Sequence, residues 1–290
     1  MSKLKLGIPK GSLEANTIDL FKRAGWRITY DDRSYSPDIN DDDISCSLVR
    51  AQEMSRYVAD GNLDLGLTGK DWIMENESDV QVVQDLVYSK TSPKEARWVL
   101  VVQEDSPIRA VADMEGKHIS TELVNFTRKY FAERHINVHV EFSWGATEAK
   151  VVEGLVDAIV EVTETGTTIR ANKLRIVHEL MRTNTQLIAN HEAWKDSWKR
   201  KKIEQIKVLL NGSLQAMGKV GLKMNVSREK LSVVTGMLPS LKAPTISGLY
   251  SEEWFAVETV VSSGMVRDLI PALQEAGAEG IIEYALNKVI

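Results

Sequence analysis

The stretch GLVDAIVEVTETGTTI, which runs from Gly154 to Ile169, reads as a strand, a turn and the start of a helix. Its first half is apolar except for Asp157 and Glu161, and its second half is a run of threonines around one glycine. A strand that leads through a short polar turn into a helix is the repeating unit of α/β proteins. The stretch therefore predicts an α/β fold.

Short apolar runs alternate with segments of helical periodicity on both sides of this stretch. Strands are predicted at residues 4–8, where Pro9 stops the strand, and at 63–67, 98–102, 117–120 and 138–142. Helices are predicted from Ser12 to about Gly25, at 53–59 and at 125–134. This alternation indicates layered α/β structure with mostly parallel strands.

The last part of the chain has a different order of elements. After a predicted helix at residues 191–210, the chain reads strand 220–226, helix 228–238, strand 245–249, strand 254–261, helix 265–276 and strand 280–284. This βαββαβ order is typical of a ferredoxin-like domain. We therefore expect a separate small domain of roughly 75 residues over 218–290.

Two charged segments have a plain structural interpretation. Asp31–Asp43 is acidic and rich in turn residues, and we interpret it as a solvated loop, since its adjacent carboxylates cannot all converge on a metal. The basic run Lys199–Lys202 lies within the predicted helix, and we interpret it as a solvated helix face and not as a polyanion site.

Composition excludes several classes of protein. The 290 residues are 43% hydrophobic with a net charge of −5, which predicts a globular protein without a broad basic face for nucleic acid or anionic lipid. Cys46 is the only cysteine, so no disulfide can form within the chain and a cysteine-based zinc site is nearly excluded. No signal peptide or membrane-spanning run is visible, and we expect a cytoplasmic protein that binds no membrane.

The turn Glu164–Thr168 is the strongest candidate binding site. Glycine and several hydroxyls at a helix start present N–H and O–H donors to one anion, and the helix dipole adds favourable potential. Asp157 and Glu161 on the preceding strand could accept hydrogen bonds from a sugar. The combination suits a ribose 5-phosphate, and the alternative is that Thr165 or Thr168 only caps the helix.

Two other strand ends carry similar signals. Pro9-Lys10-Gly11-Ser12 lies just before a helix, where an anion would meet backbone donors and Lys10 could neutralise a pyrophosphate. Asp64–Asp71 contains two glycines, which permit close approach of a ligand to the backbone. A tight turn without a binding function is the alternative for that segment.

Five motifs together resemble the ATP phosphoribosyltransferase family in order and spacing. They are Pro9–Leu13 (PKGSL), Leu48–Gln52 (LVRAQ), Asp64–Trp72 (DLGLTGKDW), Gly145–Glu148 (GATE) and Glu164–Asn172 (ETGTTIRAN). The C-terminal segments Leu238–Ser247 and Trp254–Val257 resemble the regulatory domain of the long form of that family.

The resemblance implies a catalytic part of two α/β lobes, folded like type II periplasmic binding proteins, with the active site between them. One lobe would comprise residues 1–90 and 180–212, the other residues 91–179, and the regulatory ACT-like domain residues 218–290.

The resemblance also implies the site residues. Phosphoribosyl pyrophosphate would bind Glu164, Thr165, Gly166, Thr167 and Thr168, with Asp157 and Glu161 at the acidic positions before them. ATP or pyrophosphate would bind Lys10, Gly11, Ser12, Arg50, Asp64, Gly66, Thr68 and Gly69. The family more often has aspartate at the position of Glu161, and many relatives carry arginine at the position of Ser12.

The implied reaction is attack by adenine N1 of ATP on C1 of the ribose, with loss of pyrophosphate. Adenine N1 has a free lone pair at neutral pH, so no general base is required. Mg²⁺ would bridge the substrate phosphates and stabilise the departing charge, because the polyphosphates would otherwise repel one another.

The resemblance further implies inhibition by free histidine bound within 218–290, and a homo-oligomer that forms dimers and hexamers. Two other functions remain possible from the sequence: a solute-binding protein with the same two-lobed fold, and a salvage phosphoribosyltransferase with a different fold. The C-terminal domain could also serve only for assembly.

Overall fold

A computed structural model describes residues 3–29, 36–88, 95–239, 243–251 and 253–290 of the chain. Two compact units are distinguished: residues 1–22 with 26–207, and residues 23–25 with 208–290. Residues 31–35 of the acidic stretch and residues 240–242 of the C-terminal motif lie outside the described residues.

The first unit contains two five-stranded sheets, and the first has the strand order β4-β1-β5-β12-β6. Its strands are β1 (Leu4–Lys10), β4 (Ile44–Arg50), β5 (Leu65–Gly69), β6 (Gln81–Leu86) and β12 (Thr185–Ala189). β1 runs parallel to β4 and to β5, whereas β12 runs antiparallel to β5 and β6. The carboxyl ends of three parallel strands therefore bring Lys10, Arg50 and Gly69 to one edge of the sheet.

β1 does not stop at Pro9, as the sequence predicted, but continues through it to Lys10. Pairing of β1 with β5 ends at Gly7, while pairing with β4 continues to Lys10. Pro9 thus occupies a strand position that is paired on one side only, where a missing N–H is tolerated.

Helix α1 (Glu14–Ala24) follows β1 after a turn at residues 11–13, whereas α2 (Ala51–Ala59) and α3 (Lys70–Glu75) follow β4 and β5 directly. Met54 of α2 packs on Gly7 and Gly66, where an added Cβ would lie 2.3 and 2.8 Å from its sulfur. Gly66 is therefore needed for close packing of helix on sheet.

The second sheet has the order β11-β7-β10-β8-β9. It comprises β7 (Ala96–Gln103), β8 (His118–Thr121), β9 (His139–Phe142), β10 (Ala158–Thr163) and β11 (Leu174–Thr183). β8 runs parallel to both β9 and β10, so the loops that follow these three strands share one edge. Helices α4 (Val124–Ala132), α5 (Thr147–Val152) and α6 (Thr167–Ala171) follow the same three strands.

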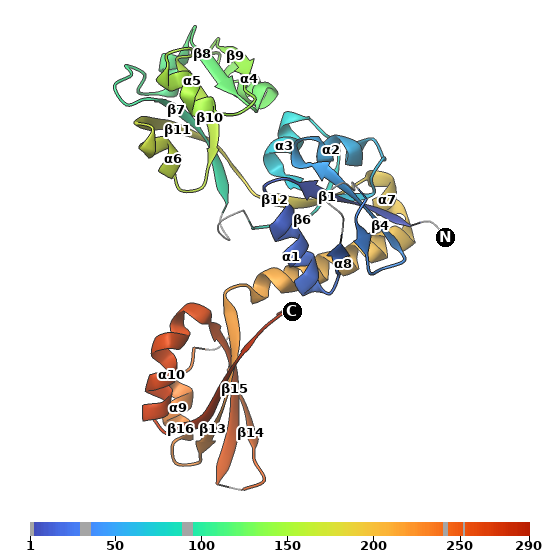
Figure 1. Cartoon of the computed structure of the whole chain (residues 1–290), viewed down its shortest axis with the longest axis vertical. Coiled ribbons are helices and arrows are strands. Elements are labelled where there is room, and N and C mark those ends of the chain that lie inside the picture. Colours follow the sequence, from blue (N-terminus) through green and yellow to red (C-terminus); the bar gives the residue numbers. More distant parts are fainter. Residues whose placement is uncertain (1–2, 30–35, 89–94, 240–242, 252) are drawn as a thin grey trace. The chain divides into compact units, whose positions relative to one another are not determined.

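The chain returns to the first sheet at residues 183–185, where β11 ends and β12 begins. β11 extends to Thr183, so this crossing lies a few residues after the boundary near 180 that the sequence predicted. Two α/β lobes within the first unit agree with the expected fold class (Figure 1).

Ion pairs engage two lysines of the basic run in the long helix α8 (Ser197–Ala216), which follows the short helix α7 (His191–Lys195). Lys202 Nζ lies 2.9 Å from Asp41 and 3.2 Å from Asp43, while Lys199 Nζ lies 2.8 Å from Asp64. The interpretation of this run as a solvated face is therefore wrong for Lys199 and Lys202. Asp41 and Asp43, at the end of the acidic stretch, therefore bind Lys202.

The second unit confirms the predicted βαββαβ order. It contains β13 (Lys219–Ser227), α9 (Leu231–Met237), β14 (Thr245–Gly248), β15 (Trp254–Ser262), α10 (Val266–Glu275) and β16 (Ala278–Ala285). The sheet order is β14-β15-β13-β16, with α9 and α10 on one face (Figure 1). Their shared core includes Leu222, Met224, Val257 and Leu273.

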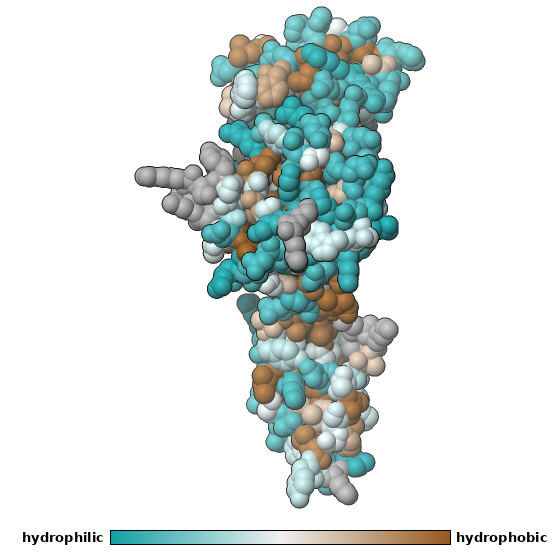
Figure 2. Space-filling model, turned by 90° about the vertical axis from the view of Figure 1, so that its right-hand side faces the viewer, coloured by the Kyte–Doolittle hydropathy of each residue, from teal (hydrophilic) through white to brown (hydrophobic). Residues whose placement is uncertain are grey.

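Apolar surface is visible on the second unit in Figure 2. Several large hydrophobic side chains of this unit are exposed, among them Val233, Ile246, Leu249 and Ile282. Within the part of the chain that the structure describes, no helix has the length and apolar character to cross a bilayer.

Candidate active site

A cleft of about 610 Å³ is lined by residues of both sheets of the first unit. The first sheet and its helices contribute Lys10, Gly11, Ser12, Leu13, Arg50, Ala51, Gln52, Gly69, Asp71, Trp72, Tyr88 and Thr185. The second sheet and the crossing contribute Ala96, Trp98, Glu122, Val162, Glu164, Thr183 and Asn184. Five residues predicted to bind ATP or pyrophosphate are thus brought together with Glu164.

One wall of the cleft is positively charged. Lys10 and Arg50 end neighbouring parallel strands and are paired in register, so their side chains start from adjacent backbone positions. The Gly11 N–H donates to the Glu14 carboxylate at 3.1 Å at the start of α1. A carboxylate at this place shows that the backbone here can receive an anion.

Three of the four residues predicted around the second glycine segment do not line this cleft. Asp64 lies at the amino end of β5, where it accepts hydrogen bonds from Lys5 N–H at 2.9 Å and from Lys199. The Thr68 hydroxyl donates to Ala51 O at 2.6 Å, and Gly66 is buried beneath Met54. Of that segment's predicted site residues, Gly69 alone reaches the cleft, together with Asp71, which the sequence analysis did not select.

The turn that follows β10 contains a glycine in the left-handed region of backbone conformation. Gly166 has φ = 73° at the position just before α6, and its N–H donates to the Thr163 hydroxyl at 2.8 Å. The hydroxyls of Thr165 and Thr167 are 2.8 Å apart and exposed, as is Thr168. Arg170 adds a cation, since its guanidinium lies 3.0 Å from where a Cβ of residue 166 would be.

Asp157 lies at the opposite end of β10 from this turn. It accepts a hydrogen bond from His118 N–H at 2.9 Å and lies 3.5 Å from Lys117 Nζ. A strand rises about 3.3 Å per residue, which places Asp157 about 13 Å from Glu161 and about 20 Å from Thr163, where β10 ends. The structure therefore does not bring Asp157 to the turn, and its role there as a sugar ligand is not supported.

Glu161 is a largely buried carboxyl among other acids. Burial, together with repulsion from Glu148 and Glu122, raises the pKa of Glu161 to about 7, against the lowering effect of hydrogen bonds from Thr147 and Val162. Thr147 is itself held by a 2.9 Å hydrogen bond to the Ser143 hydroxyl. Because side chains alternate along a strand, Glu161 faces α5 while its neighbour Val162 lines the cleft.

The floor of the cleft is formed by residues that the sequence did not single out. Asp71 is 6% exposed and accepts a 2.8 Å hydrogen bond from Trp98 Nε1. Trp72 meets Trp98 edge to face at 6.5 Å, and the Tyr88 hydroxyl bonds to Thr17 at 2.7 Å. The signal for Asp71 and Trp72 was present in DLGLTGKDW, whereas Trp98 is visible in the sequence only as a strand residue.

The geometry combines a cationic wall, a hydroxyl-rich turn and an aromatic floor, which suits a purine nucleotide and a sugar phosphate. The chain matches the family model of ATP phosphoribosyltransferase over residues 50–212, and that of HisG, C-terminal domain, over residues 216–288.

Curated relatives are similar along their whole length. The chain is 65% identical over 287 residues to the ATP phosphoribosyltransferase of Desulfosudis oleivorans, covering 99% of both chains. It is 64% identical to that of Solidesulfovibrio magneticus, covering 99% of this chain and 98% of the relative.

Among solved structures, the chain resembles the ATP phosphoribosyl transferase (HisG:HisZ) complex from Thermotoga maritima. The TM-score is 0.62 at 26% identity, and the match covers 71% of this chain and 98% of that one. The chain belongs to the ATP phosphoribosyltransferase family in its long form, and it is a pentosyltransferase of the first step of histidine biosynthesis.

Proposed function

We propose that the chain transfers the phosphoribosyl group of phosphoribosyl pyrophosphate to N1 of ATP and releases pyrophosphate. One observation carries this proposal: Lys10 and Arg50 of the first sheet line the same cleft as Glu164, the first residue of the threonine-rich turn. Two polyanions could thus be held from opposite sheets with their reacting atoms facing each other.

The sugar donor is assigned to the turn Glu164–Thr168. Three threonine hydroxyls, the bend at Gly166 and the adjacent Arg170 supply donors for a terminal phosphate. Glu164 could accept hydrogen bonds from the ribose hydroxyls. The five predicted turn residues stay in the proposal, whereas Asp157 is left out of it.

ATP is assigned to the first sheet. Lys10 and Arg50 also line a neighbouring hollow of about 450 Å³ beside Ser47 and Tyr57, which provides room for a triphosphate. The aromatic floor of the cleft at Trp72 and Trp98 suits the adenine ring. Asp64, Gly66 and Thr68 are left out, since each is engaged within the fold.

The proposed reaction needs no proton acceptor from the protein. Adenine N1 attacks through its own lone pair, and among the described residues that line the cleft there is neither a histidine nor a cysteine. Catalysis would therefore come from orientation of the two substrates and from stabilisation of the leaving group. Lys10 and Arg50 would supply fixed positive charge to that end.

Mg²⁺ is assigned to one carboxylate of the cleft together with the substrate phosphates, since no three potential ligands converge within the described part of the chain. Mg²⁺ commonly binds one or two carboxylates and completes its shell with waters and substrate phosphates. Glu122, which lines the cleft, would hold it, because a cation would relieve the repulsion from Asp71 that contributes to the raised pKa of Glu122. When bound, Mg²⁺ would neutralise charge on the leaving pyrophosphate.

The C-terminal unit is proposed to bind free histidine and to contribute to a homo-oligomer of dimers and hexamers. Its exposed hydrophobic side chains support a role in assembly. Added histidine should lower turnover of the full chain, and unchanged turnover would leave assembly as the role of this unit. A cytoplasmic location stays a prediction from the sequence.

Incubation with ATP, phosphoribosyl pyrophosphate and Mg²⁺ tests the main proposal. We expect a new ultraviolet-absorbing nucleotide and stoichiometric release of pyrophosphate. Tight binding of either substrate without any product would favour a solute-binding protein of the same two-lobed fold. A salvage phosphoribosyltransferase would instead accept a free base in place of ATP.

A further inference from the structure

Helix α3 belongs to the first sheet by its position after β5, and one side of it is fixed to that lobe. The Ser55 hydroxyl of α2 donates to Trp72 O at 3.2 Å. The Asn76 side chain, directly after α3, donates to Gln52 O at 2.8 Å and to the Ser55 hydroxyl at 2.9 Å. α3 therefore moves with α2.

The amino end of α3 is also attached to the crossing between the sheets. Lys70 N–H donates to Asn184 O at 3.0 Å, and Asp71 N–H donates to the Thr183 hydroxyl at 3.2 Å. Trp72 packs against the hydrophobic core of the second sheet, next to Trp98. This end of α3 thus holds the return crossing at residues 183–185, where the chain passes from the second lobe back to the first.

The carboxyl end of α3 reaches a helix of the second lobe. The two carboxylate oxygens of Glu75 accept hydrogen bonds from Asn125 N–H at 3.0 Å and from Phe126 N–H at 2.9 Å. The Asn125 side chain donates in return to Glu75 O at 3.2 Å. Glu75 is only 8% exposed, so these bonds are shielded from water.

These contacts replace a missing helix cap. Helix α4 begins at Val124, and its N-cap residue, Leu123, has no side-chain acceptor. The first N–H groups of a helix have no partner within it, and carboxylates stabilise them through hydrogen bonds and the helix dipole. Here the cap is provided by a residue of the other lobe.

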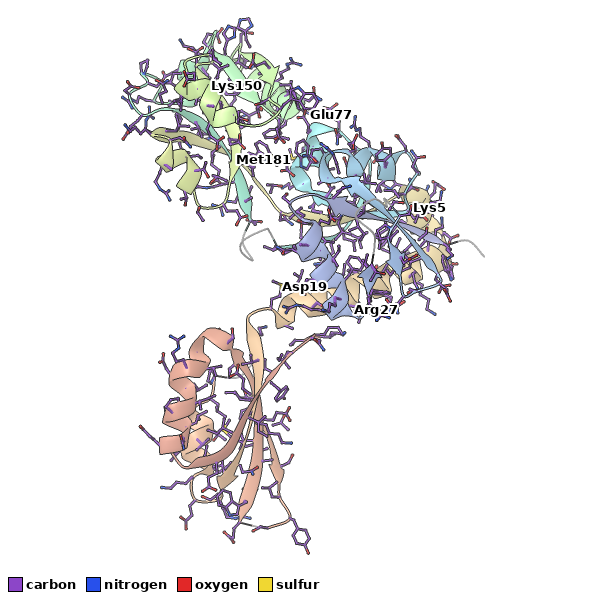
Figure 3. The ribbon with its side chains drawn as sticks, viewed as in Figure 1. Lys5, Asp19, Arg27, Glu77, Lys150 and Met181 are labelled. Atoms are coloured by element: carbon purple, nitrogen blue, oxygen red, sulfur yellow. The ribbon has the colours of Figure 1, made fainter. Side chains whose placement is uncertain are left out.

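An ion pair at the same junction contributes little. Glu77 Oε1 lies 3.5 Å from Lys129 Nζ of α4, and both side chains are about two-thirds exposed (Figure 3). Exposed pairs of this kind are screened by water and salt. Glu75 is therefore the residue that secures α4, and Glu77 offers a matched control.

We propose that Glu75 is a positioning residue for the transferase reaction. Asp71 and Glu75 are four residues apart and lie on one face of α3, about 6 Å apart along its axis. With the crossing held at Asp71, the cap at Glu75 prevents rotation of the second lobe about that point. It thereby keeps the turn Glu164–Thr168 opposite Lys10 and Arg50.

This inference rests on the proposed assignment of the two substrates to the two sheets. Glu75 touches neither substrate, so its loss should leave the binding of a single substrate to its own sheet intact. It should lower turnover, which needs both substrates in register, because small misplacements of reacting groups reduce rates steeply.

The test compares Glu75→Ala, Glu75→Gln and Glu77→Ala in the full chain. For Glu75→Ala we expect kcat to fall about tenfold, with the affinity for phosphoribosyl pyrophosphate and Mg²⁺, measured calorimetrically without ATP, unchanged within about twofold. Glu75→Gln keeps one hydrogen-bond acceptor, and its kcat should fall about threefold. Glu77→Ala should behave as wild type.

Two results would overturn the proposal: a folded Glu75→Ala variant with wild-type kcat, or an equal fall in kcat and in donor affinity, which indicates general damage to the second lobe. If Glu75→Ala does not fold, Glu75→Gln decides by the same criteria. Wild-type protein that makes no phosphoribosyl product would instead refute the proposed reaction, independently of Glu75.

Discussion

The indole N–H of Trp98 donates a 2.8 Å hydrogen bond to Asp71, and both residues are buried in the floor of the cleft. Asp71 lies on α3 beside the first sheet, whereas Trp98 lies on β7 of the second. Burial raises the pKa of Asp71, and the bond from Trp98 is the largest opposing influence. The bond satisfies an acceptor that water hardly reaches.

Replacement of Trp98 by phenylalanine should therefore destabilise the protein. Asp71 Oδ2 would lose the donor from Trp98 while staying buried, and we expect the free energy of unfolding to fall by about 1–3 kcal/mol. Urea denaturation measures this. Trp198→Phe is the control, since that side chain is 40% exposed. Equal losses for both variants would contradict a special role for the bond.

Gly166→Val should abolish binding of phosphoribosyl pyrophosphate. A branched side chain at φ = 73° is strained, and it would fill the side of the turn that faces Arg170. Calorimetry provides the measurement. Gly116→Val is a matched control, because Gly116 has φ = 72° with nothing within 4 Å of its added Cβ. Retained binding in Gly166→Val would show that the phosphate lies elsewhere.

Turnover should depend absolutely on a divalent cation. Excess chelator is expected to stop product formation, because the pyrophosphate charge would lose its counter-ion. The thermal unfolding midpoint of the substrate-free protein should not change, since no cluster of three metal ligands is present among the described residues. Appreciable turnover in chelator would contradict the proposed mechanism.

Stability should vary with pH through Glu161. Its pKa rises from 4.5 to about 7 in the folded protein, so the native state binds this proton more tightly than the unfolded chain. The resulting stabilisation is complete below pH 4.5 and is lost as the pH rises to about 7, a change of about 3 kcal/mol.

The variant Glu161→Gln has no carboxylate to bury, so its stability should not fall in this way as the pH rises. Denaturant titrations at pH 4 and pH 8 measure the free energy of unfolding. Between these two pH values, the difference between variant and wild type should shift by up to about 3 kcal/mol in favour of the variant. The neighbouring Glu148→Gln should give a smaller effect in the same direction. Parallel pH profiles for wild type and Glu161→Gln would refute the raised pKa.

The sequence predicted most elements well, because periodicity records which face of an element is buried. All six elements of the C-terminal unit lie within three residues of their predicted bounds. The prediction that Pro9 ends the strand was wrong, because proline is tolerated where a strand is paired on one side only. Which strands pair at Pro9 depends on the tertiary structure and not on the local sequence. Likewise, Lys199 and Lys202 form ion pairs with acids more than a hundred residues away in sequence.

The candidate site could be predicted only in part, for a geometric reason. Asp64 and Asp157 were grouped with the loops that follow their strands, yet both lie at the amino ends of those strands. Local sequence also does not reveal that α3 and β7 meet, so the Asp71–Trp98 floor was missed. Lys10 and Glu164 were found because each follows a predicted strand directly, whereas Arg50 was found only through the resemblance to the family.

The place of β12 in the first sheet has a consequence for how the chain acquires its structure. β6 is joined to that sheet through β12, which leaves the ribosome only after the entire second sheet has been synthesised. Until then the nascent first lobe exposes unpaired strand edges. Pairing between strands so far apart in sequence predicts slow folding and a need for protection from aggregation during synthesis.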